Sequence, residues 1–267
     1  MAYHQLSDGR RVYFEHYAGT KTPFVLSHGW GMSSTIWVDV IERLLKAGHE
    51  VLAIDHRGCG KSDRDFDDVS ISALAGDIVD IVTARNLRPA ILNGWSLGGA
   101  VVVEAVDRLG AAAAGLVLTC AASPRYVQAD DFPYGGQRAD VLGMPDAILA
   151  NRATFFRGLS EGVCAKDVGQ PTIEWMTAMF MEAGPTSIQS LLNLADIDQR
   201  AILSNLSIPV LSIVGGKDVV VQPEIGELAG KMAPKGQVAR FEDCGHAPFI
   251  EEGDLYVEKL LAFAGAL

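Results

Sequence analysis

The sequence has few features of a membrane, secreted or nucleic-acid-binding protein. No run of about eighteen uninterrupted apolar residues occurs in the 267 residues, which argues against a transmembrane helix. The first residues, MAYHQ, lack the basic stretch and the apolar core of a signal peptide, so we expect a cytoplasmic location. Only 22 lysines and arginines accompany 33 acidic residues, and the net charge of -11 disfavours a nucleic-acid or anionic membrane partner.

Cysteine is also scarce, and its spacing fits neither a metal site nor a secreted disulfide framework. We expect the four cysteines to be reduced, packed thiols: Cys59, Cys120, Cys164 and Cys244. The chemistry derived below needs no metal or organic cofactor. What the chain does have is 49% hydrophobic residues, enough for one large core in a chain of this length.

The most informative motif is GWSLG at residues 94–98. It follows the apolar run at residues 90–92 and precedes a segment that reads as a helix. Such a strand-to-helix turn forces its central serine, Ser96, into a strained conformation with an exposed hydroxyl. The flanking glycines avoid a clash between strand and helix. The turn also leaves the backbone N–H of Leu97 free at a helix N-terminus, where it can donate to an oxyanion.

A second backbone donor is expected from the turn HGWG at residues 28–31, which follows the strand pattern at residues 23–27. Trp30 N–H is the candidate, and its indole is also expected to contact substrate. His28 is expected to hold this turn by hydrogen bonds rather than to act in catalysis. Asp55 and Arg57, in the Gly-rich bend after the strand at residues 51–54, are expected to brace loops.

Two further polar side chains follow predicted strands. Asp218 comes after the strand at residues 210–214, and His246 lies in a loop after the strand at residues 238–241. Ser96, Asp218 and His246 therefore predict a nucleophile, an orienting acid and a general base. Three other acids compete with Asp218 but are less suited, because two lie in the inserted segment described below and one is too close in sequence to the histidine: Asp196, Asp198 and Asp243.

The motifs at residues 28–31, 55–60, 94–99, 215–218 and 245–249 together resemble the α/β-hydrolase superfamily over nearly the whole chain, and the order Ser, Asp, His is that of this superfamily. The sequence at residues 28–31, 94–99 and 246–250 is similar to that of the pimeloyl-carrier-protein methyl ester carboxylesterases of biotin synthesis. The tetrapeptide DHRG at residues 55–58 departs from those enzymes, and is more familiar from cofactor-free haloperoxidase-like and general esterase relatives.

Strand patterns alternate with amphipathic helix patterns, which predicts an α/β fold with a mostly parallel central sheet and helices on both faces. An antiparallel strand or two is expected within residues 10–17. One helix is expected after Ser72 as N-cap, with a stripe of Leu74, Ile78, Ile81 and Val82. Residues 1–121 and 207–267 are expected to form the core domain, and residues 122–206 a helical cap inserted in it.

Ligands of such sheets bind outside the carboxyl ends of the strands, so the cap is expected to roof the site. Its large apolar residues have two interpretations. They either line an acyl pocket or form the core of the cap itself, and the second is favoured for most of them. The residues concerned are Phe155, Phe156, Trp175, Met176, Met179 and Phe180, of which Phe155, Phe156, Trp175 and Met179 are the candidates for substrate contact.

These observations favour a carboxylic ester hydrolase acting on a small or medium acyl ester or lactone. Two alternatives stay open: cleavage of a carbon–carbon bond in a β-diketone-like substrate by the same triad, and a small-molecule receptor with slow turnover. A carrier-protein substrate is the less favoured option, because the cap is acidic overall and such a partner would need a basic patch. Arg138, Arg152 and Arg157 are the candidates for that patch.

Overall fold

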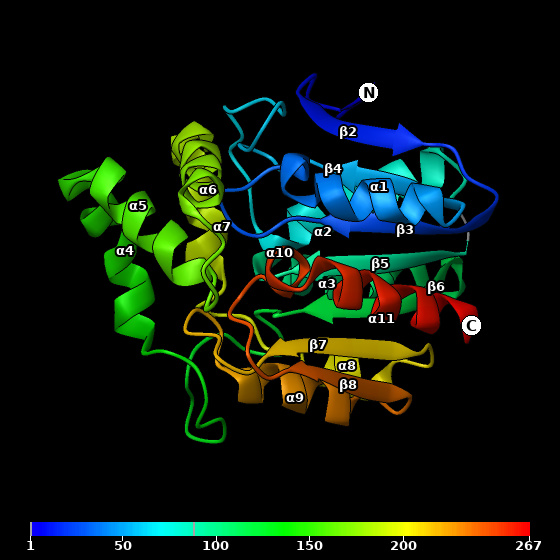
Figure 1. Cartoon of the computed structure of the whole chain (residues 1–267). Helices are drawn as coiled ribbons and strands as arrows, with labels where there is room; N and C mark the ends of the chain where they lie inside the picture. The colour runs from blue at the N-terminus through cyan, green and yellow to red at the C-terminus, as the bar shows by residue number, and fades with distance from the viewer. Residues whose placement is uncertain (1, 88) are drawn as a thin grey trace.

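The computed structural model describes residues 2–87 and 89–267, and in that part of the chain eight strands form one sheet (Figure 1). The order across the sheet is β1-β2-β4-β3-β5-β6-β7-β8. The strand bounds are β1 (Ala2–Gln5), β2 (Arg11–Tyr17), β3 (Lys21–Ser27), β4 (His49–Ile54), β5 (Ala90–Trp95), β6 (Ala113–Thr119), β7 (Val210–Gly215) and β8 (Gly236–Phe241).

The strands from β4 to β8 pair in parallel, and β1 and β2 pair antiparallel at one edge. The strands β5 and β7 are buried at every position, which explains why their sequences are mostly apolar rather than alternating. The predicted fold class is therefore confirmed. The sequence pattern located β2 but not β1, which has only four residues.

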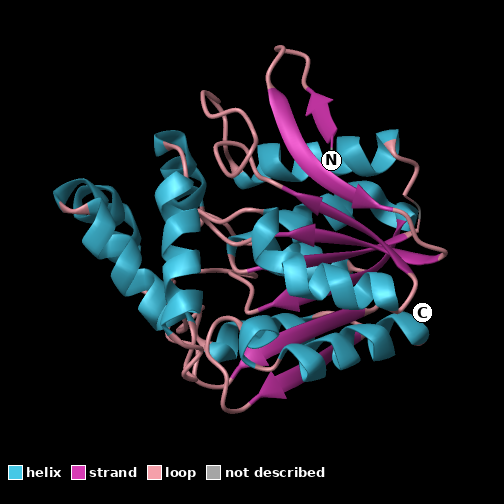
Figure 2. Cartoon of the chain, turned by 45° about the horizontal axis from the view of Figure 1, so that its top comes forward, coloured by secondary structure: helices cyan, strands magenta, loops and turns pink. Residues whose placement is uncertain are grey.

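Helices cover both faces of the sheet (Figure 2). One group contains α1 and α11, which contact each other, and the other contains α2, α3, α8 and α9, which contact one another in series. The helix bounds are α1 (Val38–Lys46), α2 (Ile71–Ala84), α3 (Leu97–Leu109), α4 (Arg138–Ala150), α5 (Arg152–Val163), α6 (Gln170–Glu182), α7 (Ile188–Asn193), α8 (Arg200–Asn205), α9 (Pro223–Met232), α10 (Pro248–Glu251) and α11 (Gly253–Gly265), with short 3₁₀ turns η1 (Ser34–Trp37), η2 (Gly110–Ala112) and η3 (Pro185–Ser187).

Helix α2 buries the predicted apolar stripe, but the predicted N-cap is wrong. The cap is Ser70, whose side chain accepts a hydrogen bond from Ala73 N at 3.2 Å. Ser72 lies inside the first turn, and its hydroxyl accepts instead from the guanidinium of Arg108 on α3 at 2.7 Å. That contact is 36 residues away in the sequence and is invisible to a local pattern.

The segment between β6 and β7 carries α4 to α8 and no named strand among its residues. Figure 1 shows α4 to α7 on the side to which the arrowheads of β3, β6 and β7 point. The part of this inserted segment that carries α4 to α7 therefore stands over the carboxyl ends of the strands, where the ligands of such sheets bind. In the described part of the chain, every helix is too short or too polar to span a bilayer.

Candidate active site

Ser96 stands at a tight turn between β5 and α3. Its φ of 57° and ψ of -123° place it in a region that non-glycine residues rarely adopt. The neighbouring glycines make this turn possible. A Cβ on Gly94 would lie 2.2 Å from the carbonyl oxygen of Gly98, and a Cβ on Gly98 would lie 2.5 Å from that of Ser27. The helix, the strand and the neighbouring strand end therefore approach too closely for any side chain.

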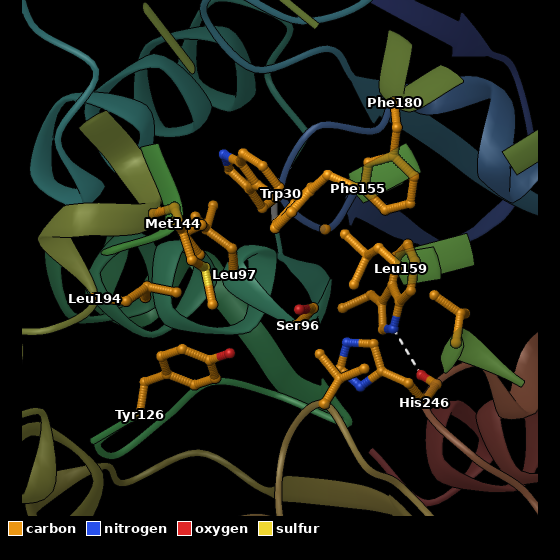
Figure 3. Close-up of a pocket in the computed structure, with 15 residues that line it drawn as sticks. Trp30, Ser96, Leu97, Tyr126, Met144, Phe155, Leu159, Phe180, Leu194 and His246 are labelled. Carbon is orange, nitrogen blue, oxygen red and sulfur yellow. Dashed lines mark hydrogen bonds between the residues drawn. The ribbon is translucent and has the colours of Figure 1, made fainter. Parts of the chain in front are cut away.

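Asp218 and His246 meet at the same edge of the sheet. Nδ1 of His246 lies 2.7 Å from Oδ2 of Asp218, and both side chains are buried. The other carboxylate oxygen accepts from the backbone N–H groups of Val220 and Val221 at 2.8 and 2.9 Å. In the neutral imidazole, Nδ1 then carries the proton and Nε2 keeps a lone pair. Figure 3 shows the Ser96 hydroxyl and the His246 ring in the same cavity.

The competing acids are engaged elsewhere. Asp243 forms an exposed ion pair with Lys217 at 2.7 Å. Asp196 and Asp198 pair with arginines of the inserted segment. Of the four acids weighed from the sequence, only Asp218 contacts the ring of His246 in the described structure.

The loop that carries His246 is held by its backbone. The N–H of His246 donates to the carbonyl of Val163 at 2.7 Å, and its carbonyl accepts from the indole of Trp95 at 2.7 Å (dashed in Figure 3). Val163 is the last residue of α5, so this loop is bonded directly to the inserted segment. The backbone of the histidine is thus fixed on both sides.

Glu251 strengthens the same junction. One carboxylate oxygen accepts from Gly245 N at 2.8 Å, and the other accepts from Ala165 N and Lys166 N at 2.9 Å each. We call this group the Glu251 clamp. A carboxylate that receives three backbone N–H groups is a strong, charge-assisted link. Sequence reasoning missed it, because nothing in the local pattern distinguishes Glu251 from the adjacent Glu252.

The turn after β3 lies directly against Ser96. A Cβ on Gly29 would lie 2.9 Å from the ring of Trp95 and 3.2 Å from the Cβ of Ser96, so a larger residue there would displace its neighbours. Among the described residues, neither Trp30 N nor Leu97 N donates a hydrogen bond within the protein. Two free N–H groups beside an exposed hydroxyl are what an oxyanion would need.

His28 holds this turn, as its position in the sequence indicates. Its Nδ1 donates to Gly29 O at 2.7 Å, and its Nε2 accepts from His56 N at 3.0 Å. Both ring nitrogens are occupied in the neutral form, and burial lowers the pKa of His28. Asp55 and Arg57 also hold the bend in which they lie: Asp55 accepts from the backbone N–H groups of Ser34 and Lys61, and Arg57 makes a two-pronged pair with Asp77 of α2.

The cavity at Ser96 is narrow and mostly apolar. The centre of a water molecule has about 70 Å³ of room in it. Its lining residues are Gly29, Trp30, Trp95, Ser96, Leu97, Tyr126, Met144, Phe155, Leu159, Val163, Phe180, Leu191, Leu194, Val220 and His246. Eight of these, the residues from Tyr126 to Leu194, come from the inserted segment.

Three residues expected to bind substrate lie outside this cavity. Phe156 is buried and stacks on Phe180, with ring centroids 5.3 Å apart, so it belongs to the packing between α5 and α6. Met179 is also buried, and its sulfur accepts from Ser33. Trp175 borders a separate surface groove. Of the expected residues, Trp30 and Phe155 line the cavity, and Phe180 does so as well.

The thiols are poorly placed to act as nucleophiles. Burial raises the pKa of Cys59 and of Cys244 to about 12, and it raises the pKa of Cys120 well above its usual value. Cys120, Asp218 and His246 could offer sulfur, oxygen and nitrogen to a metal ion, since their ligand atoms lie within 4.8 Å of one another. Two of these atoms already bond to each other, however, which favours a proton rather than a metal between them.

Comparison with known proteins places this architecture in a family. The profile of the alpha/beta hydrolase family matches residues 24–259. AB hydrolase superfamily protein YisY of Bacillus subtilis is 28% identical over 236 residues, 88% of each chain. The pimeloyl-acyl-carrier-protein methyl ester esterase of Pectobacterium carotovorum is 29% identical over 96% of this chain and 99% of its own. The chain therefore belongs to the alpha/beta hydrolase family.

The similarity extends to solved structures. An esterase from Exiguobacterium antarcticum, EaEST, superposes with a TM-score of 0.94 at 28% identity, over 98% of both chains. The relatives of this chain thus include esterases, and the resemblance noted from the motifs is confirmed at the level of the family.

Proposed function

We propose that the protein is a serine esterase that hydrolyses a small or medium acyl carboxylic ester or lactone through an acyl-enzyme on Ser96. One observation carries the proposal: a strained, half-buried serine shares an apolar cavity with a histidine whose Nδ1 bonds a buried aspartate at 2.7 Å. Two of the relatives described above are esterases, which supports the same reaction class.

In this mechanism, Nε2 of His246 takes the proton of Ser96 as the serine oxygen attacks the acyl carbon. Asp218 keeps the ring in the tautomer that leaves Nε2 free, and stabilises the imidazolium. The N–H groups of Trp30 and Leu97 receive the oxyanion, and each is worth about 3 kcal/mol in comparable sites. The alcohol leaves with the proton from His246. A water activated by the same ring then releases the acid.

We also propose that residues 122–206 act as a cap over a core formed by residues 1–121 and 207–267. The contribution of Tyr126, Met144 and Phe155 to the cavity wall supports this division. A cap of this kind excludes water from the reacting atoms, which strengthens the electrostatic contacts at the site.

Free small-molecule esters are our preferred substrates over carrier-linked ones. The three arginines weighed for a carrier are each engaged: Arg138 with Asp196, Arg157 with Glu161, and Arg152 with the carbonyl of Ala183 and the face of Phe156. Arginines used in this way contribute little to a basic docking patch.

The test is Ser96→Ala. The variant should lose hydrolysis of a generic nitrophenyl ester while keeping the circular dichroism spectrum and unfolding midpoint of the wild type, because the hydroxyl supports no core packing. Mass spectrometry of rapidly quenched wild type should also detect one acyl group on the peptide that contains Ser96. Substantial activity in Ser96→Ala, or an acyl group on another residue, would refute the assignment.

A further inference from the structure

One cavity residue has a polar group that the proposed mechanism leaves without a role. The indole N–H of Trp30 donates to Ser187 O, and that of Trp95 donates to His246 O. Ser96 and His246 belong to the proposed triad. Of the polar side chains that line the cavity in the described structure, this leaves Tyr126, whose hydroxyl makes no hydrogen bond within the protein.

In Figure 3, the hydroxyl of Tyr126 points into the cavity, towards Ser96. The residue follows β6 in a loop that is held firmly on both sides. Pro124 O accepts from Gln199 N at 2.9 Å, and the carbonyl of Tyr126 packs so closely on Gly135 that a Cβ there would lie 2.3 Å away. The backbone is therefore fixed, and the ring presents its hydroxyl from a defined position.

The surroundings determine what this hydroxyl can bind. Burial and the negative charge of Asp218 raise the pKa of Tyr126, so the phenol stays protonated and can donate. The residues that line the cavity include no lysine or arginine. A buried carboxylate of a substrate would therefore have no cation to compensate its lost hydration, whereas a neutral oxygen would need only the one hydrogen bond.

Tyr126 is half-buried, and its hydroxyl opens into the cavity without a partner from the protein, so a ligand in the cavity can supply that partner. We propose that Tyr126 determines specificity by donating a hydrogen bond to a second, uncharged oxygen in the acyl part of the ester, such as a keto or ether oxygen. The substrate class is then a neutral, oxygen-bearing acyl ester rather than a plain fatty acyl ester or the monoester of a dicarboxylic acid. This inference rests on the proposed esterase function.

The experiment compares matched nitrophenyl esters. The γ-oxopentanoyl and γ-methylpentanoyl esters differ only in that the first has a carbonyl group where the second has a methyl-substituted carbon. The δ-oxohexanoyl and δ-methylhexanoyl esters repeat the comparison one methylene further out. For at least one pair, wild-type kcat/KM should favour the oxo ester by about 10-fold, the usual value of one neutral hydrogen bond. The hydrogen adipate ester, which carries a carboxylate, should be the poorest substrate.

Tyr126→Phe should bring the preferred oxo-to-methyl ratio close to one, mainly by lowering kcat/KM for the oxo ester. Tyr134→Phe is the matched control, because Tyr134 packs edge-on against Phe132 in the same loop region and does not line the cavity. Its ratio should equal that of the wild type.

Three results would overturn the proposal: no wild-type preference in either pair, an unchanged ratio in Tyr126→Phe, or an equal loss for both members of a pair, which would indicate a general role in packing or catalysis. Failure of the esterase assignment is distinguishable from all three. In that case, the wild type would hydrolyse none of the esters, or Ser96→Ala would hydrolyse them equally well.

Discussion

Replacing Glu251 with glutamine should impair catalysis although the side chain lies outside the cavity. Glutamine keeps one acceptor oxygen and substitutes an amide NH₂ for the other. Whichever way the amide lies, at least one of the three N–H groups of the Glu251 clamp then faces a donor instead of an acceptor. The remaining bonds lose the assistance of the negative charge.

A hydrogen bond to a charged group contributes about 1.5–3 kcal/mol, and water can restore part of the loss because Glu251 is half-buried. We therefore expect Glu251→Gln to lower the free energy of unfolding by about 1–2 kcal/mol. The clamp holds Gly245, the neighbour of His246, so the base should also be misplaced. If a similar free energy is lost in the transition state, kcat falls about 10-fold while KM changes little.

The matched control is Glu252→Gln. Glu252 binds the side chain of Lys166 in the same region, but accepts no hydrogen bond from the backbone of the His246 loop. Urea denaturation and steady-state kinetics on one nitrophenyl ester would give both quantities for both variants. Equal effects of the two substitutions, or a loss confined to KM, would refute the positioning role of Glu251.

Two other perturbations test the site. Asp218→Asn should lower kcat on the order of 10⁴-fold with little change in KM. Asp243→Asn should keep nearly the activity of the wild type, because Asp243 pairs with exposed Lys217. The reverse pattern in steady-state kinetics would show that the acid is misassigned. Because burial raises the pKa of Cys59 and Cys244 from 9.0 to about 12, iodoacetamide at pH 8 should label the native protein far more slowly than the denatured chain. Unfolded thiols ionise near pH 9 and the folded ones only near pH 12, so the stability of the fold should decrease as the pH rises through that window. Equally fast labelling of the native and the denatured protein would contradict the burial argument.

The sequence located the residues whose positions depend on a nearby strand end. Ser96, Asp218 and His246 each follow a predicted strand, and the carboxyl ends of parallel strands meet at the same edge of a sheet, so their meeting could be anticipated without knowing any contact. The mostly parallel sheet with helices on both faces follows from the alternation of strands and helices, whereas the order of the strands across the sheet does not.

The residues that the sequence analysis misjudged or missed depend on contacts between segments that are distant in the sequence. Phe155 and Phe156 are adjacent on α5, and only the stacking of Phe156 on Phe180 decides which of them faces the cavity. Tyr126 stands in a loop without periodicity, so no pattern distinguishes it from the other tyrosines. Glu251 acquires its partners from a segment 86 and 85 residues away in the sequence.

The junction between α5 and the His246 loop has a consequence for how the site exchanges its contents. The N–H of His246 bonds the last residue of α5, and the Glu251 clamp ties the two residues that follow Cys164 to the same loop. A movement of α5 away from the sheet would therefore also displace His246, the proposed general base, from Ser96. Substrate entry and product release by that route would leave the proposed site inactive while α5 is displaced. A passage beside α4 and α7 would leave the arrangement of Ser96, Asp218 and His246 unchanged.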